Sequence, residues 1–84
     1  MVVVYTKNNC QRCRLTKRSL TAKGVDFAEV NVEDEPSAAG RLRAMGFRET
    51  PVVDETGAGD QSALWSGHRG DKIARLRPQR PRDR

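Results

Sequence analysis

The sequence predicts one α/β domain with a four-stranded mixed sheet and three helices, in the order β-α-β-α-β-β-α. Two observations carry this prediction. β-branched or alternating apolar segments have the length of strands, and the longer segments between them repeat their apolar residues at helical spacing. The chain has 84 residues, which suits a single domain. Hydrophobic residues make up 36% of it and follow these patterns, so we expect a packed core.

The first half of the chain predicts a β-α-β unit. Residues 2–5 form a β-branched run, which is typical of a short buried strand. Residues 11–23 contain neither Pro nor Gly, and Gly24 follows at a position that often ends a helix. Residues 27–32 alternate as a second strand, which we expect to be parallel to the first because a helix separates them. The face of the first helix that we expect to be buried carries Cys13, Thr16 and Leu20, with Leu15 beside it.

The second half predicts a helix, a β-hairpin and a last helix. We expect Asp34 to cap the second helix, with Pro36 in its first turn and Gly46 at its end. Its apolar stripe consists of Ala38, Leu42 and Met45. Val52 and Val53 predict a third strand, residues 54–62 a glycine-bearing turn, and residues 63–65 a fourth strand. A final helix over residues 69–76 would turn Ile73 and Leu76 inward and stop before Pro78.

The charge distribution separates a folded part from a basic tail. The net charge is +5, but residues 77–84 hold four Arg and one Asp, so +3 of it lies there. Because two prolines interrupt this stretch, we expect residues 1–76 to form the domain and residues 77–84 a disordered Arg/Pro-rich tail. A solvated terminus and a polyanion-binding tail are the two interpretations. With its basic excess placed there, the domain does not have the charge typical of a nucleic-acid-binding protein.

Apolar runs and the N-terminal residues indicate the cellular compartment in which we expect the protein. No apolar run approaches the roughly 18–20 residues that cross a bilayer. Residues 1–5 lack the charged region and long apolar region of a signal peptide. We therefore expect a cytoplasmic protein without a membrane partner.

The two cysteines, Cys10 and Cys13, are the strongest functional signal. A bridge across two residues restricts the unfolded chain little and adds little stability, so such a pair in a cytosolic protein points to redox chemistry or metal binding. Cys10 comes where a strand ends and a helix begins, next to unpaired backbone N–H groups that stabilise a thiolate. Lys7 and Arg12 add positive charge. We expect Cys10 to ionise at about pH 6–7.5, below the ~8.5 of a free cysteine.

The spacing of the two cysteines predicts a different role for each. Cys13 follows nearly one helical turn later, where it can attack a mixed disulfide formed by Cys10. Cys10 is thus the predicted nucleophile and Cys13 the resolving thiol. The other interpretations are an inert bridge and a zinc site, but zinc needs four ligands and the only further His or Cys is His68. We expect no metal.

Thr50 and Pro51 form a second candidate element. In an ordinary loop Thr-Pro is only a turn, but here it precedes the third strand, which this topology places beside the dithiol. A cis bond at Pro51 would leave the Thr50 backbone free to pair with an extended substrate, and X–Pro bonds adopt cis at a cost of only ~0.5–1 kcal/mol.

The chain from residue 3 to residue 76 resembles the NrdH-redoxins, glutaredoxin-like electron donors to class Ib ribonucleotide reductase. The motifs that carry the resemblance are Tyr5-Thr6-Lys7 before the dithiol, Thr16-Lys17-Arg18 after it, and Trp65-Ser66-Gly67-His68-Arg69. The resemblance implies a thioredoxin/glutaredoxin fold and a monomer that binds no cofactor. It also implies two partners, thioredoxin reductase, which passes on electrons from NADPH, and the large subunit of ribonucleotide reductase.

The resemblance assigns residues 65–69 to the partner surface. Trp65 also suits a core position that closes the hairpin, and His68 also suits a solvated surface position. Two other functions stay open. A glutathione-dependent glutaredoxin would hold glutathione carboxylates with Lys7, Arg12 and Arg48, and a protein that is not an enzyme would bind a metal or a polyanion.

Overall fold

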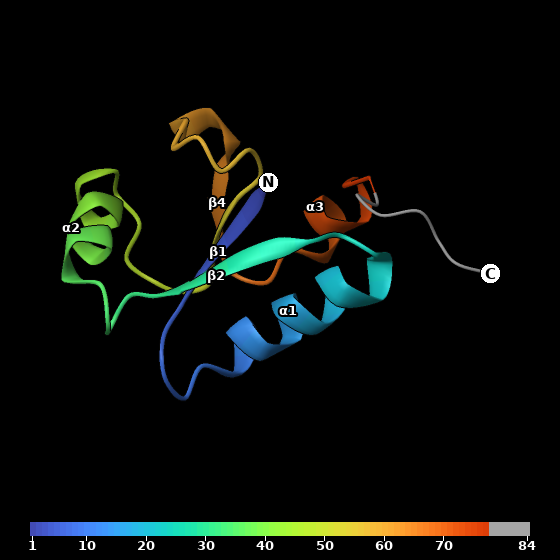
Figure 1. Cartoon of the computed structure of the whole chain (residues 1–84), viewed down its shortest axis with the longest axis horizontal. Helices are drawn as coiled ribbons and strands as arrows, with labels where there is room; N and C mark the ends of the chain where they lie inside the picture. The colour runs from blue at the N-terminus through green and yellow to red at the C-terminus, as the bar shows by residue number, and fades with distance from the viewer. Residues whose placement is uncertain (78–84) are drawn as a thin grey trace.

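Residues 1–77 are described by a computed structural model, and their elements follow the predicted order (Figure 1). The predicted tail lies outside these residues except for Arg77. Among them, no helix has the length and apolar character needed to cross a membrane. The elements are β1 (Val2–Thr6), α1 (Gln11–Lys23), β2 (Phe27–Asn31), α2 (Pro36–Ala44), β3 (Val52–Asp54), a 3-10 turn (Gln61–Ala63), β4 (Leu64–Ser66) and α3 (Gly70–Ala74).

The four strands form one mixed sheet in the order β2-β1-β3-β4. β1 pairs with β2 in parallel, as the intervening helix predicts, and β3 pairs antiparallel with both β1 and β4. In the register of the central strands, Val4 lies opposite Val53. The thioredoxin/glutaredoxin arrangement expected from the sequence is confirmed.

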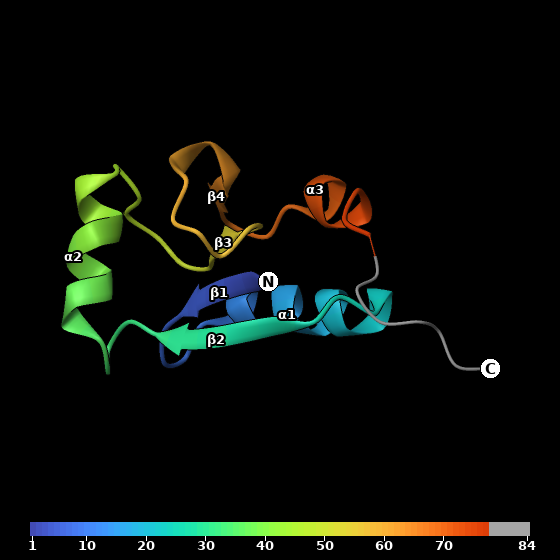
Figure 2. The same ribbon diagram turned by 45° about the horizontal axis from the view of Figure 1, so that its top comes forward.

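The sheet separates two apolar clusters, because successive side chains of a strand point to opposite faces. On one face Val2, Val4 and Val53 pack with residues of α1 and α3, among them Leu20 and Ile73. On the other face Val52 and Leu64 pack with Leu42 of α2. Figure 1 shows α2 on the opposite side of the strands from α1 and α3, and Figure 2 shows α1 running along β1 and β2.

Helix α1 has the predicted bounds, with Cys10 as its N-cap residue and Gly24 as its C-cap residue. Gly24 has φ of 81°, in the left-handed region that glycine tolerates, and the N–H groups of Gly24 and Val25 close the last turn. Cys13, Thr16 and Leu20 are the buried residues of the helix, as predicted. Leu20 packs α1 against the core cluster that includes Val2 and Val4 of β1.

Several element boundaries differ from the prediction. Glu35 rather than Asp34 precedes α2, and its side chain donates or accepts no capping bond, although Pro36 begins the helix as expected. Helix α3 spans only five residues, and Leu76 packs against the core from beyond its end. β2 ends at Asn31 rather than at residue 32, and β4 spans Leu64–Ser66 rather than residues 63–65 because Ala63 belongs to the 3-10 turn.

The loop after β3 is organised by a carboxylate that the sequence placed in a turn. Asp54 ends β3 and is 1% exposed. It accepts hydrogen bonds from the backbone N–H groups of Thr56, Gly57 and Gly59 and from the Thr56 hydroxyl, at 2.9–3.3 Å. A buried carboxylate needs such donors, so this loop is built around Asp54.

Candidate functional site

Cys10 and Cys13 form a disulfide at the start of α1. Cys10 is the N-cap residue, with extended backbone angles, and the N–H of Cys13 donates a hydrogen bond to its Sγ over 3.1 Å. This N–H is one of those that a helix leaves unpaired in its first turn. The same donor would stabilise negative charge on the sulfur when the bridge is reduced.

The two sulfurs differ in access to solvent. Cys10 is 7% exposed and Cys13 only 1%. An incoming disulfide therefore meets Cys10 first, while Cys13 lies behind it on the buried face of α1. This asymmetry suits the order of attack that the sequence predicts.

Thr50 and Pro51 lie beside the disulfide. The peptide bond between them is cis, and the Thr50 hydroxyl is 3.4 Å from the Sγ of Cys10. Because a disulfide sulfur carries no proton, the hydroxyl is the donor in this state. Within residues 1–77 the backbone N–H and C=O of Thr50 make no hydrogen bond, whereas the carbonyl of Pro51 accepts one from Gly67 at 2.8 Å.

The two predicted supporting cations have different surroundings. Arg12, next to the dithiol, forms an ion pair with Glu49 at 2.9 Å, and both side chains are about half exposed. Lys7 is exposed and forms no ion pair within residues 1–77. Glu49 therefore offsets the positive charge of Arg12 next to Thr50. The sequence analysis did not predict this ion pair.

The run from Trp65 to Arg69 connects β4 to α3. Trp65 is 6% exposed, belongs to the main core cluster, and donates from Nε1 to Glu55 at 2.7 Å. Ser66 is half-buried and Gly67, next to Pro51, is buried. The Trp65 side chain thus anchors this segment from the inside, and its assignment to a partner surface stays a prediction.

The second half of this run is more exposed. His68 Nδ1 lies 2.9 Å from the hydroxyl of Thr16, one turn after Cys13 on α1. The guanidinium of Arg69 donates two hydrogen bonds to Asp71, at 3.0 and 3.1 Å. This hydrogen bonding lowers the pKa of Asp71 and raises the pKa of Arg69. His68 therefore connects the loop to the helix that carries the dithiol.

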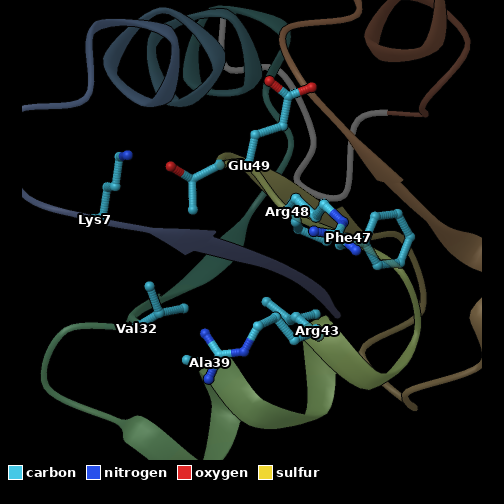
Figure 3. A pocket seen from close by; sticks show the side chains of 10 residues that line it. Lys7, Val32, Ala39, Arg43, Phe47, Arg48 and Glu49 are labelled. Carbon is cyan, nitrogen blue, oxygen red and sulfur yellow. The ribbon is translucent and has the colours of Figure 1, made fainter.

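A groove of about 330 Å³ is lined by Thr50 and by residues of α2, among them Ala39 and Arg43 (Figure 3). Lys7 lines it from the segment after β1, Arg43 from α2, and Phe47 and Arg48 from the following loop. The sequence analysis named Lys7 and Arg48 as candidate ligands of glutathione carboxylates. It did not name Arg43 as a cation of the groove or Phe47 as part of its lining. The one available signal for Arg43 is its exposed position in the last turn of α2.

No group of three or more His, Cys, Asp or Glu side chains with the geometry of a metal site occurs in residues 1–77. The one His of the chain, His68, lies against Thr16. The geometry at the dithiol is that of a sulfur pair for disulfide exchange.

The fold and the dithiol define a class of protein. The glutaredoxin family model matches residues 2–55, which include β1, the dithiol and the Thr50-Pro51 step. A four-stranded mixed sheet with a Cys-x-x-Cys pair at the start of its first helix, together with this match, defines a thiol–disulfide oxidoreductase of the glutaredoxin type.

Two relatives and one solved structure show which family within this class the chain belongs to. The glutaredoxin-like protein NrdH of Salmonella typhimurium is 51% identical over 77 residues, which cover 92% of this chain and 89% of that protein. NrdH of Lactococcus lactis subsp. cremoris is 37% identical over 76 residues, with 90% and 99% covered. The structure of NrdH-redoxin from Escherichia coli matches with a TM-score of 0.80 and 47% identity, over 94% of this chain and 97% of that one. The chain belongs to the NrdH family of glutaredoxin-like proteins.

Proposed function

We propose that this chain donates electrons to the large subunit of ribonucleotide reductase and that thioredoxin reductase, fed by NADPH, restores its dithiol. The observation that carries the proposal is the position of Cys10 as N-cap of α1, with the Cys13 N–H directed at its sulfur. The structure of the Escherichia coli relative concerns a thioredoxin-like activity profile, which supports a reductase rather than glutathione as the electron source.

The proposed reaction is a two-step exchange. The Cys10 thiolate attacks one sulfur of the partner disulfide, a mixed disulfide forms, and the other partner sulfur leaves as a thiolate. Cys13 then gives up its proton and attacks the Cys10 sulfur, which releases the second partner thiolate and closes the Cys10–Cys13 bond. The partner gains two electrons and, after taking up two protons, is a dithiol.

We assign Thr50 and Pro51 to substrate positioning. Within residues 1–77 the backbone N–H and C=O of Thr50 have no partner, and the hydroxyl of the same residue contacts Cys10, whose sulfur makes the attack. An extended segment of the partner would pair with these groups as an added strand does with a sheet edge. The protein would act in the cytoplasm as a monomer with no bound cofactor.

A coupled assay tests the electron source. The oxidised protein is mixed with NADPH and thioredoxin reductase, and the absorbance of NADPH is followed. We expect continuous consumption when a ribonucleotide reductase disulfide is added as acceptor. No consumption above background would contradict the proposal.

A variant tests the roles of the two cysteines. Cys13→Ser should form a mixed disulfide with the large subunit that does not resolve, whereas Cys10→Ser should form none. Mass spectrometry under non-reducing conditions identifies the bond. A mixed disulfide through Cys13 would reverse the assignment.

Glutathione is the second candidate electron source, because Lys7 and Arg48 place two cations along the groove beside Thr50. A glutathione-coupled assay run in parallel separates the two. Activity that depends on glutathione and survives Cys13→Ser would favour this alternative, since a monothiol route needs only Cys10.

A further inference from the structure

Three cations along the groove have no counter-charge among the residues that the structure describes. Lys7, Arg43 and Arg48 are exposed and form no ion pair or side-chain hydrogen bond with any of residues 1–77. Elsewhere on the surface, Lys17 pairs with Glu29 and Arg69 pairs with Asp71. The one carboxylate that lines the groove, Glu49, is already paired with Arg12. The rim of the groove is therefore positively charged and suited to bind anionic groups.

The floor of the groove is apolar. Leu42 from α2 and Val52 from β3 belong to the second core cluster, and Val32 and Phe47 pack against it while half-buried. Figure 3 shows Val32, Ala39 and Phe47 among the side chains that line the groove. A ligand that fills it would cover apolar surface as well as meet the cations, so its chemistry must combine both kinds of group.

The groove reaches Thr50, the residue that contacts the reacting sulfur of Cys10. Thr50 lines it, and the Thr50 hydroxyl is 3.4 Å from the Sγ of Cys10. A chain that is joined to Cys10 as a mixed disulfide and runs past Thr50 enters the groove with the residues that flank its cysteine.

We propose that this groove recognises the segment next to the disulfide of a protein substrate, and that this segment carries acidic side chains and at least one large apolar side chain. The inference rests on the proposed thiol–disulfide exchange and adds the chemistry of its substrate. The carboxylates would meet Lys7, Arg43 and Arg48, and the apolar side chain would lie on Phe47 and Leu42. Glutathione has carboxylates but no large apolar side chain, so the floor favours a protein segment.

Peptides with an activated cysteine test this recognition without a partner protein. Each peptide carries one cysteine as a 2-thiopyridyl disulfide, so that attack by Cys10 releases 2-thiopyridone, which is followed by absorbance. One peptide has two Glu and one Leu beside the cysteine, a second has Gln for Glu, and a third has Gly for Leu. The reduced protein should react about 3- to 10-fold faster with the first peptide than with the second at low salt, as expected for two exposed ion pairs.

Matched variants locate the effect in the groove. In Arg43→Gln/Arg48→Gln the preference for Glu over Gln should shrink to what Lys7 alone provides. Arg41→Gln/Arg75→Gln removes the same charge outside the groove and should keep it. Salt at 0.5 M should weaken the preference in the unmodified protein, because exposed charges are screened. The peptide with Gly for Leu should react more slowly than the first.

The outcomes separate this inference from the proposed function. Equal rates with Glu and Gln peptides, or a preference that keeps its full size in Arg43→Gln/Arg48→Gln, would overturn the inference while the exchange chemistry stands. Equal rates with Leu and Gly peptides would also overturn it. A 2-thiopyridyl disulfide of glutathione that reacts faster than every peptide, through the same two arginines, would assign the groove to glutathione instead. No release from any peptide would remove the exchange chemistry and the inference together.

Discussion

The hydroxyl of Thr50 lies 3.4 Å from the Sγ of Cys10, although 40 residues separate the two in the chain. With the N–H of Cys13 at 3.1 Å, it gives this sulfur two donors from different elements. One comes from the first turn of α1 and the other from the loop before β3. The reduced sulfur would be stabilised as a thiolate by both, so each can be tested by its effect on ionisation.

Replacement of the Thr50 hydroxyl should make Cys10 harder to ionise. Thr50→Val keeps the shape of the side chain and removes the donor. The loss of one hydrogen bond should raise the pH midpoint of Cys10 alkylation by about 0.5–1 unit. The rate of alkylation by iodoacetamide, measured across pH on the reduced protein, gives this midpoint.

Two controls accompany Thr50→Val. Thr50→Ser keeps the hydroxyl and should keep the midpoint. Thr21→Val makes the same change at an exposed position on α1 and should have no effect. An unchanged midpoint in Thr50→Val would show that the hydroxyl does not stabilise the thiolate.

The ion pair with Glu49 should determine how strongly the positive charge of Arg12 stabilises the Cys10 thiolate. Glu49→Gln should lower the midpoint of Cys10 alkylation because Arg12 is then no longer offset. Arg12→Gln should raise it because Glu49 is left unpaired next to Thr50. The double variant should return close to the original value, and added salt should shrink both shifts. Shifts in the same direction would contradict this account.

Stability should respond much less than reactivity to these changes. Both partners are about half exposed, and such pairs contribute roughly 0–1 kcal/mol to the free energy of unfolding. Urea unfolding of the same variants provides this comparison.

The parts of the fold that local patterns specify could be predicted from the sequence. The bounds of α1 follow from Gly24 at its end and from the lack of Pro and Gly within it, and its buried face follows from helical spacing. The order of strands and helices follows from the same reasoning. The dithiol at the start of α1 is also local, since it needs only a strand, a short turn and a helix in sequence.

The topology predicts that Thr50-Pro51 lies beside the dithiol, but the other contacts of the site between distant segments could not be predicted. Arg12 and Glu49 are 37 residues apart, and Thr16 and His68 are 52 apart. Whether two such side chains meet depends on how the elements pack, which no local pattern encodes. The same holds for the groove, because its cations come from the segment after β1, from α2 and from the loop that follows it.

The contact between His68 and Thr16 should couple the loop after β4 to α1. Thr16 is 0% exposed, and its hydroxyl lies 2.9 Å from Nδ1 of His68. A double-mutant cycle of Thr16→Val and His68→Ala should give a coupling of about 0.5–1.5 kcal/mol in the free energy of unfolding, the usual contribution of one hydrogen bond. Backbone hydrogen exchange in residues 66–69 should rise in both single variants. Additive effects would indicate that the contact adds no stability.

Two glycines of the loop after β3 should differ in their tolerance of a side chain. Gly57 and Gly59 have φ of 75° and 80°, so Ala at either position adopts a left-handed conformation that costs about 1–2 kcal/mol. A Cβ on Gly57 would also collide with the backbone carbonyl oxygen of Met1, whereas a Cβ on Gly59 would meet no atom of residues 1–77 within 4 Å. Gly57→Ala should therefore lower the free energy of unfolding more than Gly59→Ala does. Because both variants share the backbone cost, the difference between their urea unfolding curves measures the collision alone. Equal losses would show that Met1, which precedes β1, moves aside without cost.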